Sequence, residues 1–203
     1  PYATWETAAR VLQEAADAAQ AGDTVIATNG VYSTGGRVVF GQVMNRLAIP
    51  AGVTVQSVEG PEVTLIEGAP GTDETGESGN GNGDGAVRCV QLGRDSAWVG
   101  FTLRNGHTRT EGPYDLDQSG GGAWGDLRAQ LMKCVLTNNA AHHMGGGAFR
   151  VELSHCELRR NVARYGGGVC LGTVSDSILS GNSAENGGGA YLSRLTGCTV
   201  SNN

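Results

Sequence analysis

Side chains suited to acid–base chemistry concentrate in the segment 107–119 and in two short segments that follow it. The candidates for a catalytic role are Arg109, Glu111, Tyr114, Asp115, Asp117, His142 and Arg164. An arginine could neutralise the carboxylate of an acidic sugar while a tyrosine or histidine removes the adjacent proton, which is the chemistry of a polysaccharide lyase. Two of the acidic residues could instead form the carboxylate pair of a glycoside hydrolase. Their spacing matches no enzyme signature, so the residues alone favour neither reaction.

Part of this set could bind a glycan without transforming it. The candidate ligand-binding residues are His107, Tyr114, His142, His143 and Tyr165. Long polar loops on one side of a repeat protein often form its binding face. The plainer alternative, solvated loops without a ligand, stays open.

A weak calcium motif precedes these residues. The run 80–85, Asn-Gly-Asn-Gly-Asp-Gly, resembles the first half of an acidic calcium loop, but its twelfth position is Gln91 rather than glutamate. The candidate calcium ligands are Asp73, Glu74, Glu77 and Asp84. His142 and His143 are adjacent and would point to opposite sides of an extended segment, which disfavours a zinc site shared with His107. We therefore expect no cofactor, with calcium as the one candidate.

These residues lie between the units of an internal repeat. Gly-Gly-Gly begins at positions 120, 145, 166 and 187, so the last three copies are 21 residues apart. A second motif, an aliphatic residue followed by two variable residues and asparagine, ends at Asn139, Asn161, Asn182 and Asn203. Two motifs that recur in one phase indicate a solenoid, in which each repeat stacks on the next.

The pattern within each repeat predicts short β-strands. Residues 134–137 alternate between inward and outward positions, as expected of a strand with one buried face. About 21 residues accommodate three strands and three corners, and equivalent strands of successive turns then pair in parallel. The corner asparagines can bond to one another and tolerate left-handed backbone, and glycine suits positive φ or close backbone approach. The sequence therefore predicts an all-β protein, a parallel β-helix.

We expect a single β-helix domain over residues 1–203. Residues 4–21 are predicted to form an α-helix that caps the core, 22–119 to form irregular turns with long loops at 69–85 and 107–119, and 120–203 to form regular turns. The segments 101–106, 63–68 and 24–29 align with 134–139, which gives Leu103, Leu65 and Ile26 the inward position of Leu136. Because residue 203 falls in mid-turn, we expect a piece of a longer solenoid or an end that associates with a partner.

Two stretches resemble known β-helix families. Gly22-Asp23-Thr24-Val25-Ile26 followed by Asn29-Gly30-Val31-Tyr32 resembles the start of right-handed parallel β-helix proteins of the pectate-lyase-like superfamily. The later half resembles the repeats of bacterial polymorphic outer-membrane proteins, which combine Gly-Gly-Ala with Phe-x-x-Asn. Gly-Gly-Ala stands here at 121–123, 146–148 and 188–190, with Leu or Val in place of the Phe. The resemblance implies a right-handed β-helix of an exported, bacterial cell-surface protein, and it specifies no activity.

Cysteine and aromatic residues also recur in phase. Cys134, Cys156 and Cys198 share an inward position with Ser177, which favours a stack of small core residues. A Cys134–Cys156 disulfide in an oxidising compartment is the alternative. The aromatic residues after the glycine triplets are interpreted as a stack in the core or on a face rather than as a sugar platform; they are Trp124, Phe149 and Tyr191.

Composition limits the function. The chain has 203 residues, of which 34 are glycine, and its net charge of −6 argues against nucleic-acid binding. No apolar run reaches the length of a membrane span. We therefore predict a non-catalytic extracellular or cell-surface scaffold for adhesion or passenger-type display, with a carbohydrate or a host or cell-surface protein as partner. The alternative is a carbohydrate-active enzyme, either polysaccharide lyase or glycoside hydrolase, or a glycan-binding module.

Overall fold

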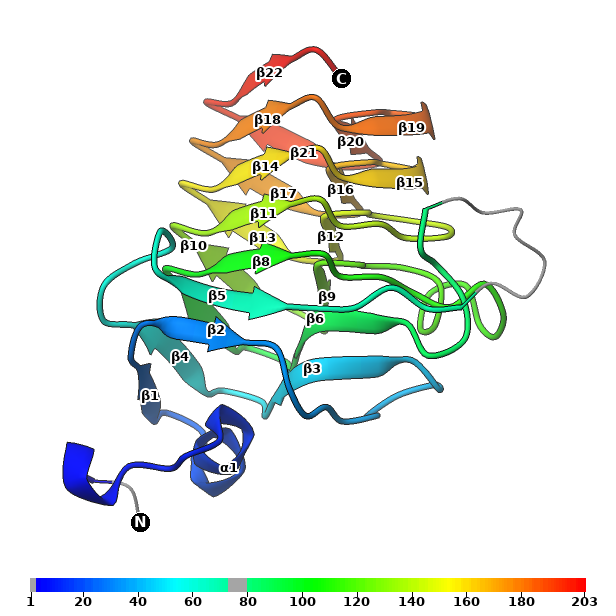
Figure 1. Ribbon diagram of the computed structural model, residues 1–203. Coiled ribbons are helices and arrows are strands. Elements are labelled where there is room, and N and C mark those ends of the chain that lie inside the picture. Colours follow the sequence, from blue (N-terminus) through cyan, green and yellow to red (C-terminus); the bar gives the residue numbers. More distant parts are fainter. Residues whose placement is uncertain (1–2, 73–79) are drawn as a thin grey trace.

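A computed structural model describes residues 3–72 and 80–203 as parallel strands coiled about one axis (Figure 1). Sheet A contains β1 (Thr24–Ala27), β4 (Thr54–Ser57), β7 (Ala97–Val99), β10 (Gln130–Met132), β13 (Glu152–Ser154), β17 (Thr173–Ser175) and β21 (Arg194–Thr196). Sheet B contains β2 (Gly30–Tyr32), β5 (Thr64–Glu67), β8 (Thr102–Arg104), β11 (Val135–Thr137), β14 (Glu157–Arg159), β18 (Ile178–Ser180) and β22 (Thr199–Ser201). Sheet C contains β3 (Met44–Ile49), β6 (Val87–Leu92), β9 (Ala123–Gly125), β12 (Ala148–Phe149), β16 (Val169–Cys170) and β20 (Ala190–Tyr191). The fold is a right-handed parallel β-helix, as predicted.

Inward side chains stack in columns along the axis and form the core. In sheet A, Trp98, Leu131 and Leu153 occupy one register position in successive turns, and all three are buried. In sheet B, Leu103 and Leu136 do the same. Because strands of all three sheets contribute alternate residues to this one interior, the short strands share a continuous apolar core.

The predicted register is wrong in two early segments. Ile66, not Leu65, pairs with Leu103 and is fully buried, so the segment 63–68 is shifted by one residue. The segment 24–29 supplies β1 of sheet A, not a strand of sheet B, and its Ile26 is 45% exposed. Both segments have aliphatic residues at inward and outward positions alike. The sequence pattern therefore does not distinguish the correct register from one that is shifted by one residue.

An asparagine ladder forms the corner between sheets B and C. The Nδ2 atoms of Asn139, Asn161 and Asn182 donate to Oδ1 of the next asparagine at 3.0, 2.9 and 2.8 Å. The same Oδ1 atoms accept the backbone N–H of the previous ladder residue. The predicted left-handed backbone lies one residue earlier, for example at Asn138 with φ of 55°. The chain turns at that residue so that the following asparagine can point into the interior.

The glycine triplets pack directly against this ladder. The first glycine of each triplet has positive φ, as Gly145 does at 63°. A Cβ on Gly147 would lie 2.5 Å from the carbonyl oxygen of Gly168 and 3.0 Å from Nδ2 of Asn161. The triplet therefore meets both requirements that the sequence suggested, positive φ and close backbone approach.

The N-terminal helix is shorter than the predicted 4–21. A 3₁₀ turn, η1 (Trp5–Thr7), precedes the seven-residue helix α1 (Leu12–Ala18), and residues between them are not helical. Only Leu12 and Ala16 of α1 are buried, against the core beside β3 and β1. The helix thus covers part of the end of the core (Figure 1). Within the described ranges, no helix has the length and apolarity needed to cross a membrane.

The predicted cysteine stack is present. Cys134 and Cys156 are buried, Ser177 follows them, and the partly exposed Cys198 ends the column. All five cysteines are free thiols in the structure. Burial raises the pKa of Cys89 to about 12 and that of Cys170 to about 11, so these thiols hold their protons near neutrality.

We expect only Cys198 to react quickly with a water-soluble disulfide reagent at pH 8, and all five cysteines to react after unfolding. Thiolates are the reactive species, and burial shields Cys89, Cys134, Cys156 and Cys170 from the reagent. Raised pKa values further reduce the thiolate content of Cys89, Cys134 and Cys170. In the unfolded chain thiols ionise near pH 8.5, whereas Cys89 and Cys170 keep their protons in the folded state. Stability is therefore expected to fall as pH rises from about 9 towards 11. Denaturant midpoints at pH 8 and pH 10.5 test the pH dependence of stability. Rapid reaction of several thiols in the native protein would contradict the prediction that only Cys198 reacts quickly.

Candidate functional site

Several connections between sheets B and C project from one corner of the solenoid, as predicted. β15 (Val162–Tyr165) pairs with β19 (Ser183–Asn186). Met144 forms single β-bridges with Tyr165 in the following turn and with Ser119 in the preceding turn. The segments 107–119 and 140–144 therefore continue the same projection through earlier turns (Figure 1). The 69–72 and 84–87 parts of the earlier loop pair with one another through Ala69–Val87 and Thr72–Asp84 bridges.

A column of rings runs along this projection. The ring centroids of Tyr114 and His143 are 4.5 Å apart and stacked, those of His143 and Tyr165 are 5.2 Å apart, and those of Tyr165 and Tyr191 are also 5.2 Å apart. Tyr114 is 62% exposed at one end of the column, and the others are partly buried. We call Tyr114, His143, Tyr165 and Tyr191 the ring column. Each ring comes from a different turn, so the stacking of the repeats creates the column.

The two adjacent histidines have opposite surroundings, as their spacing predicts. His143 lies within the ring column, where burial, with a smaller contribution from the positive charge of Arg164 and from His142, lowers its pKa. His142 is exposed on the other side, and its backbone N–H donates to Oγ1 of Thr108 at 2.9 Å. The pair therefore does not converge on one metal ion.

The candidate arginines are held in separate ion pairs. Arg109 pairs with Asp84 at 2.7 Å, and Arg164 pairs with Glu185 at 3.1 Å. The guanidinium of Arg164 also lies 5.5 Å from the centroid of Tyr165, over its ring. Arg164 therefore extends the ring column with a positive charge, whereas Arg109 joins the two long loops to one another.

Asp117 is buried and holds the segment 107–119 in place through its Oδ1 atom. It is 1% exposed, and its Oδ1 accepts the backbone N–H groups of Gln42 and Val43 at 2.5 and 2.9 Å. This contact fastens the segment 107–119 to a third long connection, 33–43, that the sequence analysis overlooked. Asp115 faces Arg150 at 3.7 Å, and Glu111 is exposed. The three carboxylates thus have different surroundings, which does not favour a hydrolase pair.

A buried arginine that sequence reasoning missed holds the same loop. Arg88 of β6 is 2% exposed. Burial lowers the pKa of its guanidinium to about 9, although the negative charge of Asp117 acts in the opposite direction, so Arg88 is a cation at neutral pH. Its guanidinium donates at 2.7–2.8 Å to Oδ1 of Asn45 and to the carbonyl oxygens of Leu116, Ser119 and Gly120. An arginine within the apolar run 87–92 was the available signal.

The in-phase aromatic residues form a second, smaller core on the outer face of sheet C. Trp124 and Phe149 are 6% and 0% exposed, and Leu116 from the loop packs on them with Met144. The indole Nε1 of Trp124 donates to the carbonyl oxygen of Asp115 at 2.6 Å. Trp124 and Phe149 therefore anchor the loop and do not form a sugar platform, as the sequence analysis favoured. Tyr191, the third of these residues, packs against the same cluster and also contacts Tyr165 in the ring column.

The comparisons with known proteins assign no family and no function to this chain. No protein-family model matches the chain, and no curated protein matches it in sequence. Among solved structures, it is similar to the A-module of mannuronan C-5 epimerase AlgE4 from Azotobacter vinelandii, with a TM-score of 0.41 and 14% identity over 92% of this chain and 53% of that one. The chain spans about half the length of that module.

Of the four predicted calcium ligands, Asp84 lies in the part of the chain that is described. Asp73, Glu74 and Glu77 lie outside the described residues. Asp84 faces Arg109, and Oδ1 of the buried Asn82 accepts the backbone N–H of Thr108 at 3.1 Å. Across residues 3–72 and 80–203, no three His, Cys, Asp or Glu side chains are placed to share a metal ion.

His107 is partly buried with its Nδ1 2.9 Å from the carbonyl oxygen of Asn105, and burial lowers its pKa.

Proposed function

We propose that this chain is a non-catalytic extracellular scaffold for adhesion that binds neutral glycans along the ring column. The column carries the proposal, because it places an exposed tyrosine and three partly exposed rings in one row beside Arg164. Tyrosine combines an apolar ring with a hydroxyl group, which suits the mixed apolar and polar surface of a sugar. The rings follow one another at about the spacing of stacked strands, about 5 Å, so they offer repeated contacts to a polymer.

The charges near the column favour binding over catalysis. A lyase needs an arginine free to meet a carboxylate, yet Arg109 and Arg164 already face Asp84 and Glu185. Oδ1 of the buried Asp117 already accepts two backbone N–H groups. The net charge of −6 also disfavours polyanionic glycans, so a neutral glycan is the preferred ligand.

Glycan binding is tested with immobilised neutral polysaccharides and the purified chain. We expect Tyr114→Ala and Tyr165→Ala to weaken binding at least tenfold, because each removes a ring and its hydroxyl from the column. Arg164→Ala is expected to weaken it less, by a few-fold. Arg128→Ala is the matched control, since Arg128 is also an exposed, ion-paired arginine but lies away from the column.

The same preparations distinguish the enzymatic alternative. We expect neither new reducing ends nor unsaturated sugar products after long incubation with each polysaccharide. Product formation that is lost in His142→Ala or Arg109→Ala would show an enzyme instead. Equal binding by the wild type and by both tyrosine variants would rule out the ring column as the site.

A further inference from the structure

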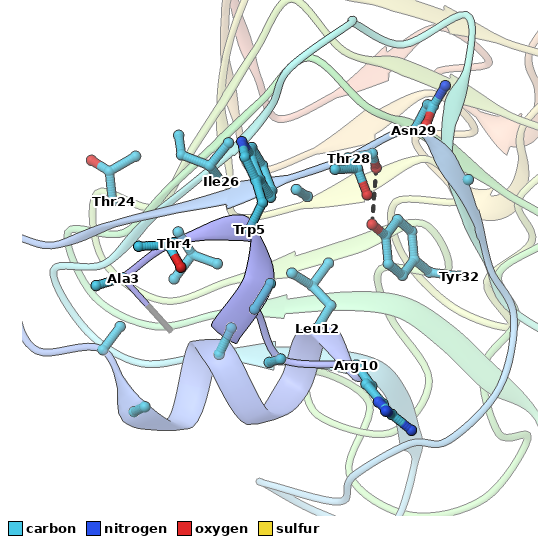
Figure 2. Close-up of a pocket in the computed structure, with 18 of the residues that line it drawn as sticks. Ala3, Thr4, Trp5, Arg10, Leu12, Thr24, Ile26, Thr28, Asn29 and Tyr32 are labelled. Carbon is cyan, nitrogen blue, oxygen red and sulfur yellow. Dashed lines mark hydrogen bonds between the residues drawn. The ribbon is translucent and has the colours of Figure 1, made fainter. Parts of the chain in front are cut away.

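The groove at the N-terminal end and the ring column both combine aromatic rings with polar groups. The groove has a volume of about 1110 Å³ and lies between residues 3–19 and 23–32 (Figure 2). The hydroxyl of Tyr32 donates there to the carbonyl oxygen of Thr28 at 2.9 Å, and Thr24 is open to water. Water satisfies exposed polar groups, so this groove requires no ligand. The ring column differs, because it contains a polar atom that water does not reach.

His143 is the member of the ring column that can titrate near neutral pH. Its imidazole is stacked on the ring of Tyr114, with centroids 4.5 Å apart and planes inclined by 25°. It meets the ring of Tyr165 edge to face, at 5.2 Å and 69°. Nδ1 of His143 is buried, and no described residue forms a hydrogen bond with it. This arrangement suits a neutral imidazole, in which an unprotonated Nδ1 has no proton to donate.

The charges near His143 disfavour its protonation. The titratable and charged groups around it are Tyr114 of the segment 107–119, Arg164 and Tyr165 of β15, Glu185 of β19, which pairs with Arg164, and His142 of its own segment. Burial contributes most to the lowered pKa of His143, and the positive charge of Arg164 and the neighbouring His142 add to it. Among the described residues, no carboxylate pairs with His143 to compensate for these effects.

We propose that His143 makes the ring column an acid-sensitive binding surface, which holds its ligand near neutral pH and releases it on acidification. This inference rests on the glycan binding proposed above. Protonation places a proton on a buried Nδ1 that has no acceptor in the described structure, beside the positive charge of Arg164. The imidazolium then turns out to water, and its stack with Tyr114 is lost.

The direction of the pH effect follows from the two arrangements of His143. In the open arrangement the imidazole takes up a proton near the ordinary pKa of histidine, about 6.5. In the packed column its pKa is lowered, so protonation occurs only at lower pH. The packed column is therefore fully favoured above about pH 6.5 and becomes less stable as the pH falls below that value.

Immobilised neutral polysaccharide is the probe for this effect. We expect the affinity of the full chain to fall about three- to tenfold between pH 7.5 and pH 5.0, since one unit of pKa difference corresponds to tenfold. His143→Phe keeps an aromatic ring but cannot titrate, so the ratio of its two affinities should be near one, whatever its affinity at pH 7.5. His155→Asn is the matched control, because His155 is an exposed histidine between β13 and β14, and it should keep the wild-type ratio.

Variants of the Arg164–Glu185 ion pair test the charge effect without changing His143. Arg164→Gln removes a positive charge, so the pKa of His143 in the packed column should rise and the ratio of the two affinities should shrink. Glu185→Gln leaves Arg164 without its counter-charge, so the ratio should grow. If Arg164 only supports the structure, its loss would weaken binding equally at both pH values and leave the ratio unchanged, which would contradict the proposal.

Proton NMR titration of the four histidine rings tests the switch without a glycan, with single histidine variants to assign the signals. We expect His143 to titrate below pH 6.5 and its ring contact with Tyr114 to disappear as it does so. A contact that persists after protonation would overturn the inference, as would an acid-induced loss of binding that survives in His143→Phe or is removed by His107→Asn. If no polysaccharide binds at any pH, the proposed function fails, and the titration still decides whether protonation opens the column.

Discussion

Replacing Asn161 with alanine is expected to lower the free energy of unfolding by about 4 kcal/mol. The change leaves the backbone N–H of Asn139 and the carbonyl oxygen of Leu136 without their bonds, and it takes one donor from Oδ1 of Asn182 and one acceptor from Nδ2 of Asn139. Each buried polar group left unsatisfied costs about 1–3 kcal/mol. Asn161 is fully buried, so water cannot replace the missing partners.

Urea denaturation followed by circular dichroism measures this effect. Asn186→Ala is the control, because Asn186 is an exposed asparagine of β19 that lies outside the ladder, and it should change stability by less than about 0.5 kcal/mol. Similar losses in the two variants would mean that the ladder does not stabilise the turns.

Replacing Arg88 with methionine is expected to cost about 3–5 kcal/mol, the usual range when one partner of a buried charged network is removed. Methionine is similar in length but leaves the carbonyl oxygens of Leu116, Ser119 and Gly120 without donors. It also removes the cation near the buried carboxylate of Asp117. Because Leu116 and Ser119 belong to the segment 107–119 and Gly120 follows it directly, that loop should detach first.

Loop detachment has a functional consequence that can be measured separately. Tyr114 lies on the same loop, so Arg88→Met should also abolish the glycan binding proposed for the ring column. Hydrogen exchange should accelerate in 107–119 more than in β13 or β14. Arg128→Met, at an exposed ion pair, is the control and should be near neutral. A loss below about 1 kcal/mol for Arg88→Met would show that the loop is held by its other contacts.

The regular spacing of the repeat motifs explains which parts of the fold could be predicted from the sequence. Stacked equivalents in a solenoid must occupy the same environment, so the glycine triplets and corner asparagines predict both the coil and the columns of Leu103 and Leu136. The prediction was wrong where the repeat is irregular. Leu65 and Ile66 are both aliphatic, and only the pairing of β5 with β8 decides which one faces inward.

The sequence predicted where on the solenoid the candidate site lies, but it did not predict how the side chains of the site are arranged. The loop lengths predicted that Tyr114, His143 and Tyr165 share one corner, and the structure confirms this. They did not predict that Asp117 would be buried against the 41–43 turn, because that contact joins residues about 75 positions apart with no shared motif. The role of Arg88 was missed for the same reason.

The sequence by itself therefore determined the parallel β-helix, its regular turns and the corner from which the long loops project. It did so because a repeated environment leaves a repeated signature. Only the tertiary structure decided which polar residues are free: it buries Asp117 and Arg88 beneath the loops, pairs Arg109 with Asp84, and leaves Tyr114 exposed. Those outcomes depend on unique long-range contacts of the irregular turns, and such contacts leave no periodic trace in the chain.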